Sequence, residues 1–490
     1  MLNTEYKKDD FLHDFLASLV VFLVALPLCL GIALASGVPP IVGLMAGIIG
    51  GLVVGSFTGS PLQVSGPAAG LAVMVFEVVD AHGLEAMAIV CFVAGIFQLL
   101  GAFLKLGNLF KAVSPAVVKG MLSGIGLLIF ASQFHVMLDH KPSSSGVENL
   151  TTIPQAFLDI FSTKLPVQHE HAATIGLITL LCLVGWNTIR EKVKLPVPAP
   201  LIAIIVSAAI ANFAGLGINF ISIPDNLLDG LSFNLWEGIQ NINAELIFAG
   251  IGMGLVATTE TLLCVTAVDT IKPDHKSNYN QELMAQGIGN TLAGLVGAMP
   301  ITGVIVRSSA NLEFGGRTRV STILHGAWLV LFLFLFSNIL AYIPTSALAA
   351  ILVYTGYKLF DFKAFKKFNT EFGKSEVLIY LVTIVSIISI NLLYGVMIGY
   401  ALSLVQLIYR LNDFQIEVEN KEGVLKVNLH GAMTFLTLPG LSKRIDESLE
   451  DHQGDVHLDA SKVSFMDSAS HEYLDVLHKN IGDKMKLEKK

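Results

Sequence analysis

Charge is scarce in this sequence. Asp, Glu, Lys and Arg together make up 14% of its 490 residues, whereas hydrophobic residues make up 53%. Soluble globular domains carry about 25% charged residues, so the shortage of charge excludes an ordinary soluble protein. The same composition predicts a chain that crosses a membrane several times.

Cysteine is also rare, and familiar catalytic motifs are missing. The four cysteines fall inside long apolar runs, where they behave as small apolar side chains. This placement supports neither a disulfide framework nor a metal cluster. The sequence has no P-loop, GxSxG, HExxH or EF-hand pattern. It therefore predicts neither an ATP-driven pump nor an enzyme, and it implies no catalytic residues and no cofactor.

Four histidines gather around one predicted loop, residues 139–171. They are His135, His140, His169 and His171. A metal site is one interpretation of this group, because imidazole is a common metal ligand. Histidines in a loop are more often solvated than bound to a metal ion, so we expect no metal site there.

Long apolar runs dominate most of the chain. A membrane-spanning helix needs roughly 20 mostly apolar residues. Fourteen windows meet or approach this length, with the third and tenth shorter than the rest: 12–36, 38–57, 64–80, 84–104, 114–138, 172–187, 197–217, 245–268, 281–299, 301–312, 320–341, 344–359, 375–394 and 395–411. The N-terminus MLNTEYKKDD is polar and mixed in charge, so we expect no cleavable signal peptide.

The basic residues between these windows are distributed unevenly. If the N-terminus lies inside the cell, the exterior loops carry only Lys141 and Lys164, and the other Lys and Arg residues between the spans are cytoplasmic. Such an excess of positive charge is typical of the cytoplasmic side. We therefore predict a multi-pass protein of a bacterial inner membrane, with both termini in the cytoplasm.

The fourteen windows divide into two halves of seven, residues 1–217 and residues 245–411. An odd number of spans in each half means that any internal repeat is inverted in the membrane. Each half contains one short window broken by Gly and Pro, at Ser65-Gly66-Pro67 and at Pro300-Ile301-Thr302-Gly303. Two broken segments at matching positions predict the binding site of a transporter.

The physical chemistry of a broken span favours an anion as its ligand. Irregular backbone survives at membrane depth only where it is buried in protein or lines a wet cavity. A helix that starts there directs its free N–H groups and its positive dipole end into the cavity. The candidate binding residues are Ser65, Gly66, Ala68, Ala69, Thr302, Gly303 and Val304. The alternative is that both segments are only kinks that complete the packing of the helices and bind no ligand.

Two charged residues lie inside the predicted spans near these segments. Arg307 follows Gly303 by about one helical turn, and Glu260 lies near the middle of the eighth span. Charges inside a span are costly and usually functional. We predict that Arg307 binds the anion, with neutralisation of Glu260 or extension toward the cytoplasm as alternatives. We predict that Glu260 carries a coupling proton or contacts a coupling cation, with a purely structural pair with Arg307 as the alternative.

The composition changes abruptly after residue 411. The stretches FQIEVEN and GVLKVNLHG alternate apolar and polar residues, which predicts two strands. A helical pattern follows in LPGLSKRIDESLEDH, then a strand in VHLDAS, then a second helix that begins at Asp467 or Ser468. Residues 412–490 are therefore predicted to form a small soluble α/β domain.

With these motifs in order, the chain resembles the SulP family of anion transporters. The resemblance rests on ALPLCLGIALASGVPP in the first span, SGPAAG in the third, TETLL in the eighth, ELMAQGIGNTLAGLVGAMPITGVIVRSSAN, and GGRTR after it. The tail sequence LDASKVSFMDSAS resembles a STAS domain, the cytoplasmic module of this family. The tail is shorter than a full STAS domain, so it is interpreted as a truncated one.

The resemblance implies an all-α polytopic fold of fourteen spans in a seven-plus-seven inverted repeat, followed by the small cytoplasmic α/β domain. Spans 1–4 and 8–11 would form a moving core, and spans 5–7 and 12–14 a gate domain that makes homodimer contacts. The anion would lie between the third and tenth spans and would cross the membrane by an elevator motion of the core.

The resemblance also bears on the substrate and on coupling. The motifs TETLLCVTAVD and MPITGVIVRSSAN are most similar to those of bacterial members found with carbonic anhydrases, so bicarbonate is favoured over sulfate, dicarboxylate or chloride. A sodium site of related transporters lacks its hard oxygen ligands here, because Cys264 lies one turn after Glu260 and Ala68 follows Pro67. Proton coupling through Glu260, or no coupling, is therefore favoured over sodium.

Three kinds of function remain open from the sequence. They are a secondary anion transporter or exchanger, an anion channel of the same fold, and a membrane receptor that signals through its tail. Glu260 favours the first, since a channel needs no coupling group. The expected partners are a small inorganic anion, a coupling proton or sodium ion, membrane lipid and a second copy of the chain, with no nucleic acid.

Overall fold

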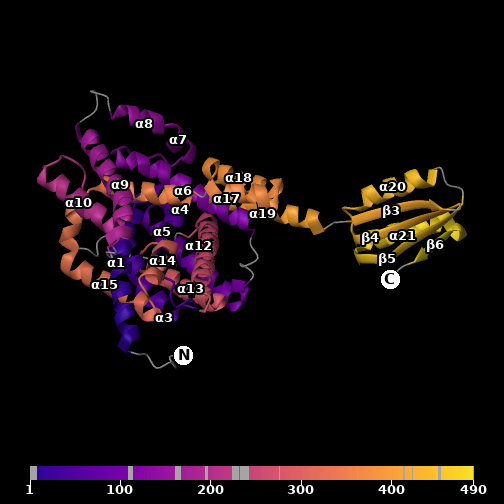
Figure 1. Ribbon diagram of the computed structural model, residues 1–490, viewed down its shortest axis with the longest axis horizontal. Coiled ribbons are helices and arrows are strands. Elements are labelled where there is room, and N and C mark those ends of the chain that lie inside the picture. Colours follow the sequence, from indigo (N-terminus) through magenta and orange to yellow (C-terminus); the bar gives the residue numbers. More distant parts are fainter. Residues whose placement is uncertain are drawn as a thin grey trace. The chain divides into compact units, whose positions relative to one another are not determined.

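The chain forms two compact units, Met1–Gly399 and Tyr400–Lys490. The first is helical and the second contains a four-stranded sheet, as the computed structural model shows (Figure 1). Lys164 and most of the connection between the two predicted halves lie outside the described residues. The structure describes residues 8–108, 114–160, 167–193, 197–222, 231, 242–274, 276–360, 362–411, 414–421, 423–450 and 454–488.

Helices occupy the apolar windows of the first half in the predicted order. They are α1 (Lys8–Ala35), α2 (Pro40–Ile49) with the π-helical turn Gly50–Val54 and α3 (Gly55–Phe57), α4 (Ala69–His82), α5 (Leu84–Phe103), α6 (Pro115–Met137), α9 (Val167–Val193) and α10 (Ala199–Phe213). Two short helices, α7 (Gly146–Thr151) and α8 (Ile153–Asp159), lie in the predicted loop between α6 and α9.

The second half follows the same plan. Its helices are α12 (Ala244–Ile271), α13 (Tyr279–Val296), α14 (Ile305–Glu313), α15 (Arg319–Phe336) with the 3-10 turn Ser337–Tyr342, α16 (Thr345–Leu359), α17 (Phe362–Lys367) with the π-helical turn Phe368–Phe372, α18 (Lys374–Ser389) and α19 (Leu392–Leu411). Within the described residues, eight helical segments of the chain are long and apolar enough to cross a membrane.

Two short strands interrupt the spans where the sequence places Gly and Pro. β1 (Ser65–Pro67) precedes α4, and β2 (Ile301–Gly303) precedes α14. The two strands pair antiparallel, with Ser65 opposite Gly303 and Gly66 opposite Thr302, and every residue of both strands is buried. This pairing gives hydrogen-bond partners to backbone that no helix could satisfy.

The helices of the first unit pack in two groups. In one group, α5 packs against α12 and α13, and α1 packs against α2 and α15. In the other, α6 packs against α16 and α18, and α9 packs against α10 and α16. α1 and α12 begin the two predicted halves, and each packs against the fourth span of the opposite half. A two-fold relation between the halves produces such an exchange of partners, and the boundaries of the halves stay a prediction.

Glycines allow close packing between α5 and α13. A Cβ on Gly294 would lie 2.5 Å from the backbone nitrogen of Phe92, and one on Gly287 would lie 2.8 Å from that of Leu99. Small residues that let two backbones approach are the usual basis of tight helix packing in membranes. α13 is therefore packed closely against α5.

A buried acid ties the start of α1 to the motif GGRTR. Asp14 accepts hydrogen bonds from the backbone nitrogens of Arg317 at 2.7 Å and Thr318 at 3.0 Å, and from the Thr318 hydroxyl. The Arg317 guanidinium reaches Asp9 at 2.6 Å and Asp10 at 2.9 Å. GGRTR therefore joins the start of α1 to the start of α15 through hydrogen bonds and ion pairs.

The second unit is a mixed sheet with two helices. Its strands are β3 (Phe414–Lys421), β4 (Val424–Met433), β5 (Asp455–Met466) and β6 (Met485–Glu488), in the order β3-β4-β5-β6. β3 and β4 are antiparallel, and the other pairs are parallel. The helices are α20 (Leu438–Glu450) and α21 (Ser468–Ile481). The buried core of the unit includes Leu441 of α20, Leu458 of β5 and Leu474 of α21.

The strands and helices predicted for this unit are confirmed, and β6 is an addition that the sequence pattern did not indicate. The alternating apolar residues Leu425, Val427 and Leu429 are all buried, as the period of two in β4 requires. Asp467 is the residue before α21, and its carboxylate accepts a hydrogen bond from the backbone nitrogen of Ser470 at 2.8 Å. This is the predicted N-terminal cap.

The cap makes a testable link between stability and pH. Hydrogen bonds from Ser470 and from the backbone of Phe435 hold the pKa of Asp467 below its ordinary value. A group whose pKa is lowered in the folded state stabilises that state at pH values above the pKa that the group has in the unfolded state. This contribution is lost as the pH falls through the folded-state pKa. We expect Asp467→Ala to increase hydrogen exchange of the α21 amides at neutral pH, with a difference from the parent that shrinks in acid.

The exposed Glu472 of α21 supplies the control. Glu472→Ala should leave the exchange of these amides close to that of the parent at every pH. A difference between Asp467→Ala and the parent that stays constant from neutral to acidic pH would contradict the assigned cap.

Candidate functional site

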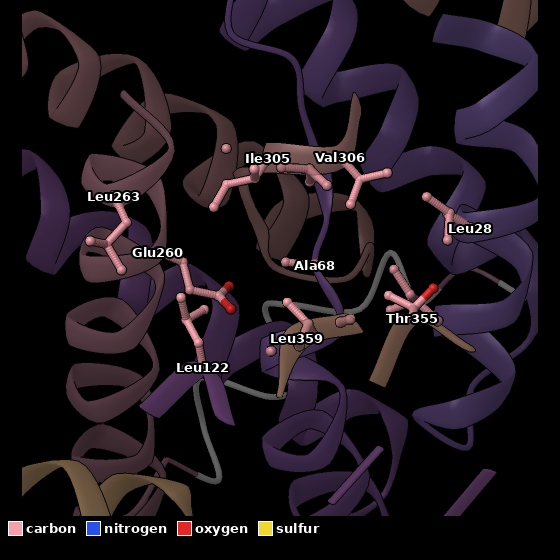
Figure 2. A pocket seen from close by; sticks show the side chains of 14 residues that line it. Leu28, Ala68, Leu122, Glu260, Leu263, Ile305, Val306, Thr355 and Leu359 are labelled. Carbon is pink, nitrogen blue, oxygen red and sulfur yellow. The ribbon is translucent and has the colours of Figure 1, made fainter. Parts of the chain in front are cut away.

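A cavity of about 70 Å³ lies where α4 and α14 begin (Figure 2). Its volume suits several water molecules or one small anion. Helices of both packing groups line it, with Leu28 of α1, Leu122 of α6 and Leu359 of α16 among the apolar side chains. The polar side chains in the lining are Glu260 of α12 and Thr355 of α16. The cavity therefore lies between the two groups of helices.

Two helices start at this cavity without a capping side chain. Ala68 precedes α4 with φ −110° and ψ 139°, and Val304 precedes α14 with φ −108° and ψ 112°. Both residues have extended backbone, and neither helix has a side-chain hydrogen bond at its N-cap. The first N–H groups of a helix have no partner inside the helix. The two starts therefore present free N–H groups and positive dipole ends to one small space.

Glu260 projects into the same space. Figure 2 shows its carboxylate directed into the cavity near Ala68. The Thr302 hydroxyl donates to Glu260 Oε2 at 3.4 Å, and a Cβ placed on Gly70 would collide with Glu260 Oε1. Only glycine at position 70 lets the carboxylate approach the start of α4 so closely. A charged Glu260 and a bound anion would therefore compete for this helix start.

Arg307 does not line the cavity. Its side chain is fully buried, and Nη2 donates to the carbonyl oxygen of Pro67 and to Cys29 Sγ, each at 3.4 Å. Nε and Nη1 have no hydrogen-bond partner among the described residues, and Nη1 lies against Gly66. The guanidinium is thus behind β1. Full burial excludes its predicted extension toward the cytoplasm, and the described part of the chain contains no ion pair between Arg307 and Glu260.

The other predicted site residues separate into two sets. Ala68, Ala69, Gly303 and Val304 line the cavity, and their role in anion binding stays a prediction. Ser65, Gly66 and Thr302 belong to the paired strands and do not line the cavity, whereas Gly303, the last residue of β2, does. The Ser65 hydroxyl accepts from Gln286 Nε2 at 2.8 Å, which turns it toward α13.

One face of α13 carries functional residues that sequence reasoning missed. Glu282, Gln286 and Asn290 are spaced four residues apart, and all three are fully buried. Asn290 accepts from the backbone nitrogen of Ile301 at 2.6 Å and donates to its carbonyl oxygen at 2.9 Å. Gln286 holds β1 through Ser65. Polar residues at this spacing in the apolar stretch ELMAQGIGN were the available signal.

Glu282 anchors the chain segment that leads into β1. Its carboxylate accepts from the Thr58 hydroxyl, from the backbone nitrogen of Gly59 at 2.9 Å, and from Gln63 Nε2 at 2.8 Å. It also accepts from Gln286 Nε2 at 2.9 Å. A buried carboxylate with several donors positions a loop more firmly than a neutral acceptor does. Both strands are therefore held by the same face of α13.

Three of the loop histidines lie near one another. The rings of His140 and His169 are 4.9 Å apart at their centroids, and those of His135 and His140 are 6.4 Å apart. Among the described residues, no group of three or more His, Cys, Asp or Glu side chains is arranged to hold a metal ion.

Sequence profiles of known families match both units of the chain. The profile of the Sulfate permease family matches residues 11–383. The chain belongs to this family. The profile of the STAS domain matches residues 415–486. The protein is thus a multi-pass SulP anion transporter with a C-terminal STAS domain, and the family is not enzymatic.

Curated relatives of this sulfate permease family member carry two kinds of name. The chain is 28% identical over 434 residues to the putative sulfate transporter YvdB of Bacillus subtilis, with 84% of this chain and 78% of the relative covered. It is 26% identical over 370 residues to the bicarbonate transporter BicA of Synechocystis, with 73% of this chain and 63% of the relative covered. These names do not select one anion.

Solved structures confirm the predicted fold class. The transmembrane domain of a cyanobacterial bicarbonate transporter BicA matches with a TM-score of 0.65 at 23% identity, and covers 80% of this chain and 98% of that one. Murine Slc26a9 in the inward-facing state matches with a TM-score of 0.80 at 16% identity, and covers 100% of this chain and 86% of that one. At these identities the likeness shows the fold alone.

The polar face of α13 generates a prediction about stability. In Glu282→Gln, one carboxylate oxygen becomes an NH₂ group, which faces either the donors of Thr58 and Gly59 or those of Gln63 and Gln286. The variant loses hydrogen bonds to a charged acceptor, and its NH₂ group lies against other N–H and O–H donors. Together these changes should lower the free energy of unfolding by about 2–3 kcal/mol. We expect a lower thermal unfolding temperature of the purified protein in detergent. Glu85→Gln, at an exposed position in the first turn of α5, is the matched control. Equal unfolding temperatures for both variants would contradict the anchoring role.

Proposed function

We propose that this transporter moves bicarbonate across a bacterial inner membrane together with a proton. The observation that carries the proposal is the meeting of two uncapped helix starts and the Glu260 carboxylate at one cavity. The proposal places both termini in the cytoplasm and assigns the homodimer contacts to the helices that pack with α6.

The charges around the cavity support proton coupling. A helix start contributes roughly half a positive charge, so the two together supply about one unit. This is enough to balance either an ionised Glu260 or a bound monovalent anion, and not both. A proton on Glu260 removes its charge and leaves the helix starts to the anion. Loss of the proton inside the cell would then favour release of the anion.

The position of the cavity supports an elevator motion. One wall is formed by the helix starts and by α12, and the facing wall includes Leu122, Thr355 and Leu359 of the other helix group. The facing wall is mostly apolar, so it can slide past the bound anion without breaking many hydrogen bonds. Motion of one group against the other would carry the anion between the two sides.

The charge balance favours bicarbonate over sulfate. About one unit of positive charge from two helix starts matches a monovalent anion. Sulfate transport is the second candidate, because Arg307 lies behind β1 and its charge acts across a short distance in a poorly screening interior. That additional charge would help to balance a divalent anion.

Glu260 provides the first test of this proposal. In liposomes, parent protein should take up labelled bicarbonate faster with an inward proton gradient. Glu260→Gln should remove this dependence on the gradient, because glutamine cannot exchange a proton. The control Glu85→Gln should retain it. If the rate of uptake by the parent protein does not depend on the proton gradient, proton symport is ruled out.

The start of α4 provides the second test. Ala69 lines the cavity, and Ala69→Leu adds a bulky side chain to a space of about 70 Å³. Occlusion that costs about 1.4 kcal/mol of anion binding lowers uptake tenfold at low substrate, and we expect at least this loss. Ala214→Leu, at the exposed end of α10, should leave uptake unchanged. Full uptake by Ala69→Leu would reject the assigned site.

A further inference from the structure

A second cavity, of about 440 Å³, lies near the C-terminal end of α1. We call it the vestibule and define it by Gly31, Gln133, Asp139, Lys141 and Leu348. It is lined by α1, α6 and α16, which also contribute to the first cavity, here near the C-terminal ends of α1 and α6 and the N-terminal end of α16. The vestibule and the first cavity therefore follow one another along the boundary between the two helix groups.

One apolar side chain of α16 lies between residues that line the two cavities. Leu352 of α16 lies between Thr355, which lines the first cavity, and Leu348, which lines the vestibule. It is 1% exposed, and a Cβ on Gly31 would lie 3.4 Å from its Cγ and Cδ1. Leu352 therefore packs against Gly31 between the two sets of lining residues, where it is placed to close a path from one cavity to the other.

The vestibule contains polar groups without partners. Gln133 is only 2% exposed and lines the cavity, yet its amide makes no hydrogen bond to the described residues. Its amide is therefore available to a ligand or water in the cavity, with two N–H donors and one acceptor oxygen. Lys141 at the rim is exposed and forms no ion pair within the described part of the chain.

The lining of the vestibule also contains acceptors. The Asp139 carboxylate accepts from Asn219 Nδ2 at 2.7 Å and keeps further acceptor capacity. Burial and the neighbouring His169 hold the pKa of His140 below its ordinary value, with His135 acting in the same direction and Asp159 and Asp139 opposing it. His140 is therefore largely neutral at pH 7, and one of its ring nitrogens can accept.

This mixture of donors and acceptors has a chemical consequence. Bicarbonate carries one negative charge and one O–H group, so it can accept from Lys141 and Gln133 and donate to an acceptor such as Asp139. Sulfate has no proton to donate at neutral pH and carries two negative charges, so the Asp139 carboxylate repels it. The vestibule matches a singly charged oxyanion that retains a hydrogen.

We propose that the vestibule is a capture site that binds bicarbonate before it passes Leu352, and that Asp139 selects against sulfate there. The proposal rests on the proposed function and adds a second binding site with its own selectivity. Lys141 and Gln133 are its binding residues.

Transport kinetics test the binding residues. Lys141→Gln and Gln133→Leu should each raise the KM for bicarbonate about fivefold to tenfold, with little change in kcat, because they remove binding outside the first cavity. Asp139→Asn should make sulfate a stronger competitive inhibitor by about tenfold; Asn tolerates the φ of 64° at this position. Lys105→Gln, a matched change at another exposed lysine, should behave as the parent. An unchanged KM in both binding variants would overturn the proposal.

A labelling experiment tests capture without relying on transport. Pro142 lines the vestibule, and Pro142→Cys in a Cys182→Ser background offers a thiol to a membrane-impermeant anionic reagent. Bicarbonate should slow the reaction, sulfate should slow it less, and Lys141→Gln should abolish the protection. Absence of protection by bicarbonate would overturn the capture site even if transport is observed. Protection without uptake of any anion would reject the proposed transport function and leave the capture site standing.

Discussion

The pairing of β1 with β2 is the interaction on which the rest of the site depends. Backbone groups that leave a helix inside a membrane protein need partners, because hydrocarbon offers none. The antiparallel pair supplies them and lets α4 and α14 begin at one cavity. The polar face of α13 holds both strands through Ser65 and Ile301. Without this support, the two helix starts would have no fixed positions.

The same pairing distributes the charges of the site. Arg307 belongs to α14, yet its guanidinium returns behind β1 and contacts Pro67. Glu260 approaches the same segment at Gly70, and the described residues contain no ion pair between it and Arg307. The positive and negative side chains are thereby kept apart by the strand, and neither neutralises the other. The helix starts and Glu260 line the cavity itself, whereas Arg307 does not, so ionisation of Glu260 changes the charge balance at the cavity directly.

Much of this arrangement could be predicted from the sequence, and the rest could not for definable reasons. The lengths of the apolar runs predicted the positions of the spans, and Pro67 and Pro300 predicted where two spans are interrupted, because these signals are local in the sequence. The direction of Arg307 depends on how α14 is rotated after β2, which is set by pairing with a segment far away in the chain. The role of Glu282 likewise depends on the Thr58 loop, and β6 depends on its parallel neighbour β5.

If the anion passes from the vestibule to the first cavity, the apolar contact between Gly31 and Leu352 is the barrier that must open. A barrier made of charged or hydrogen-bonded side chains would have to break those bonds each time the path opened. A leucine against a glycine separates by sliding, with loss of dispersion contacts only. Such a barrier excludes water and ions when closed, because it leaves no polar group exposed. The site can therefore keep its polar groups for the anion, in the cavities on either side, while the boundary between the helix groups stays apolar and mobile.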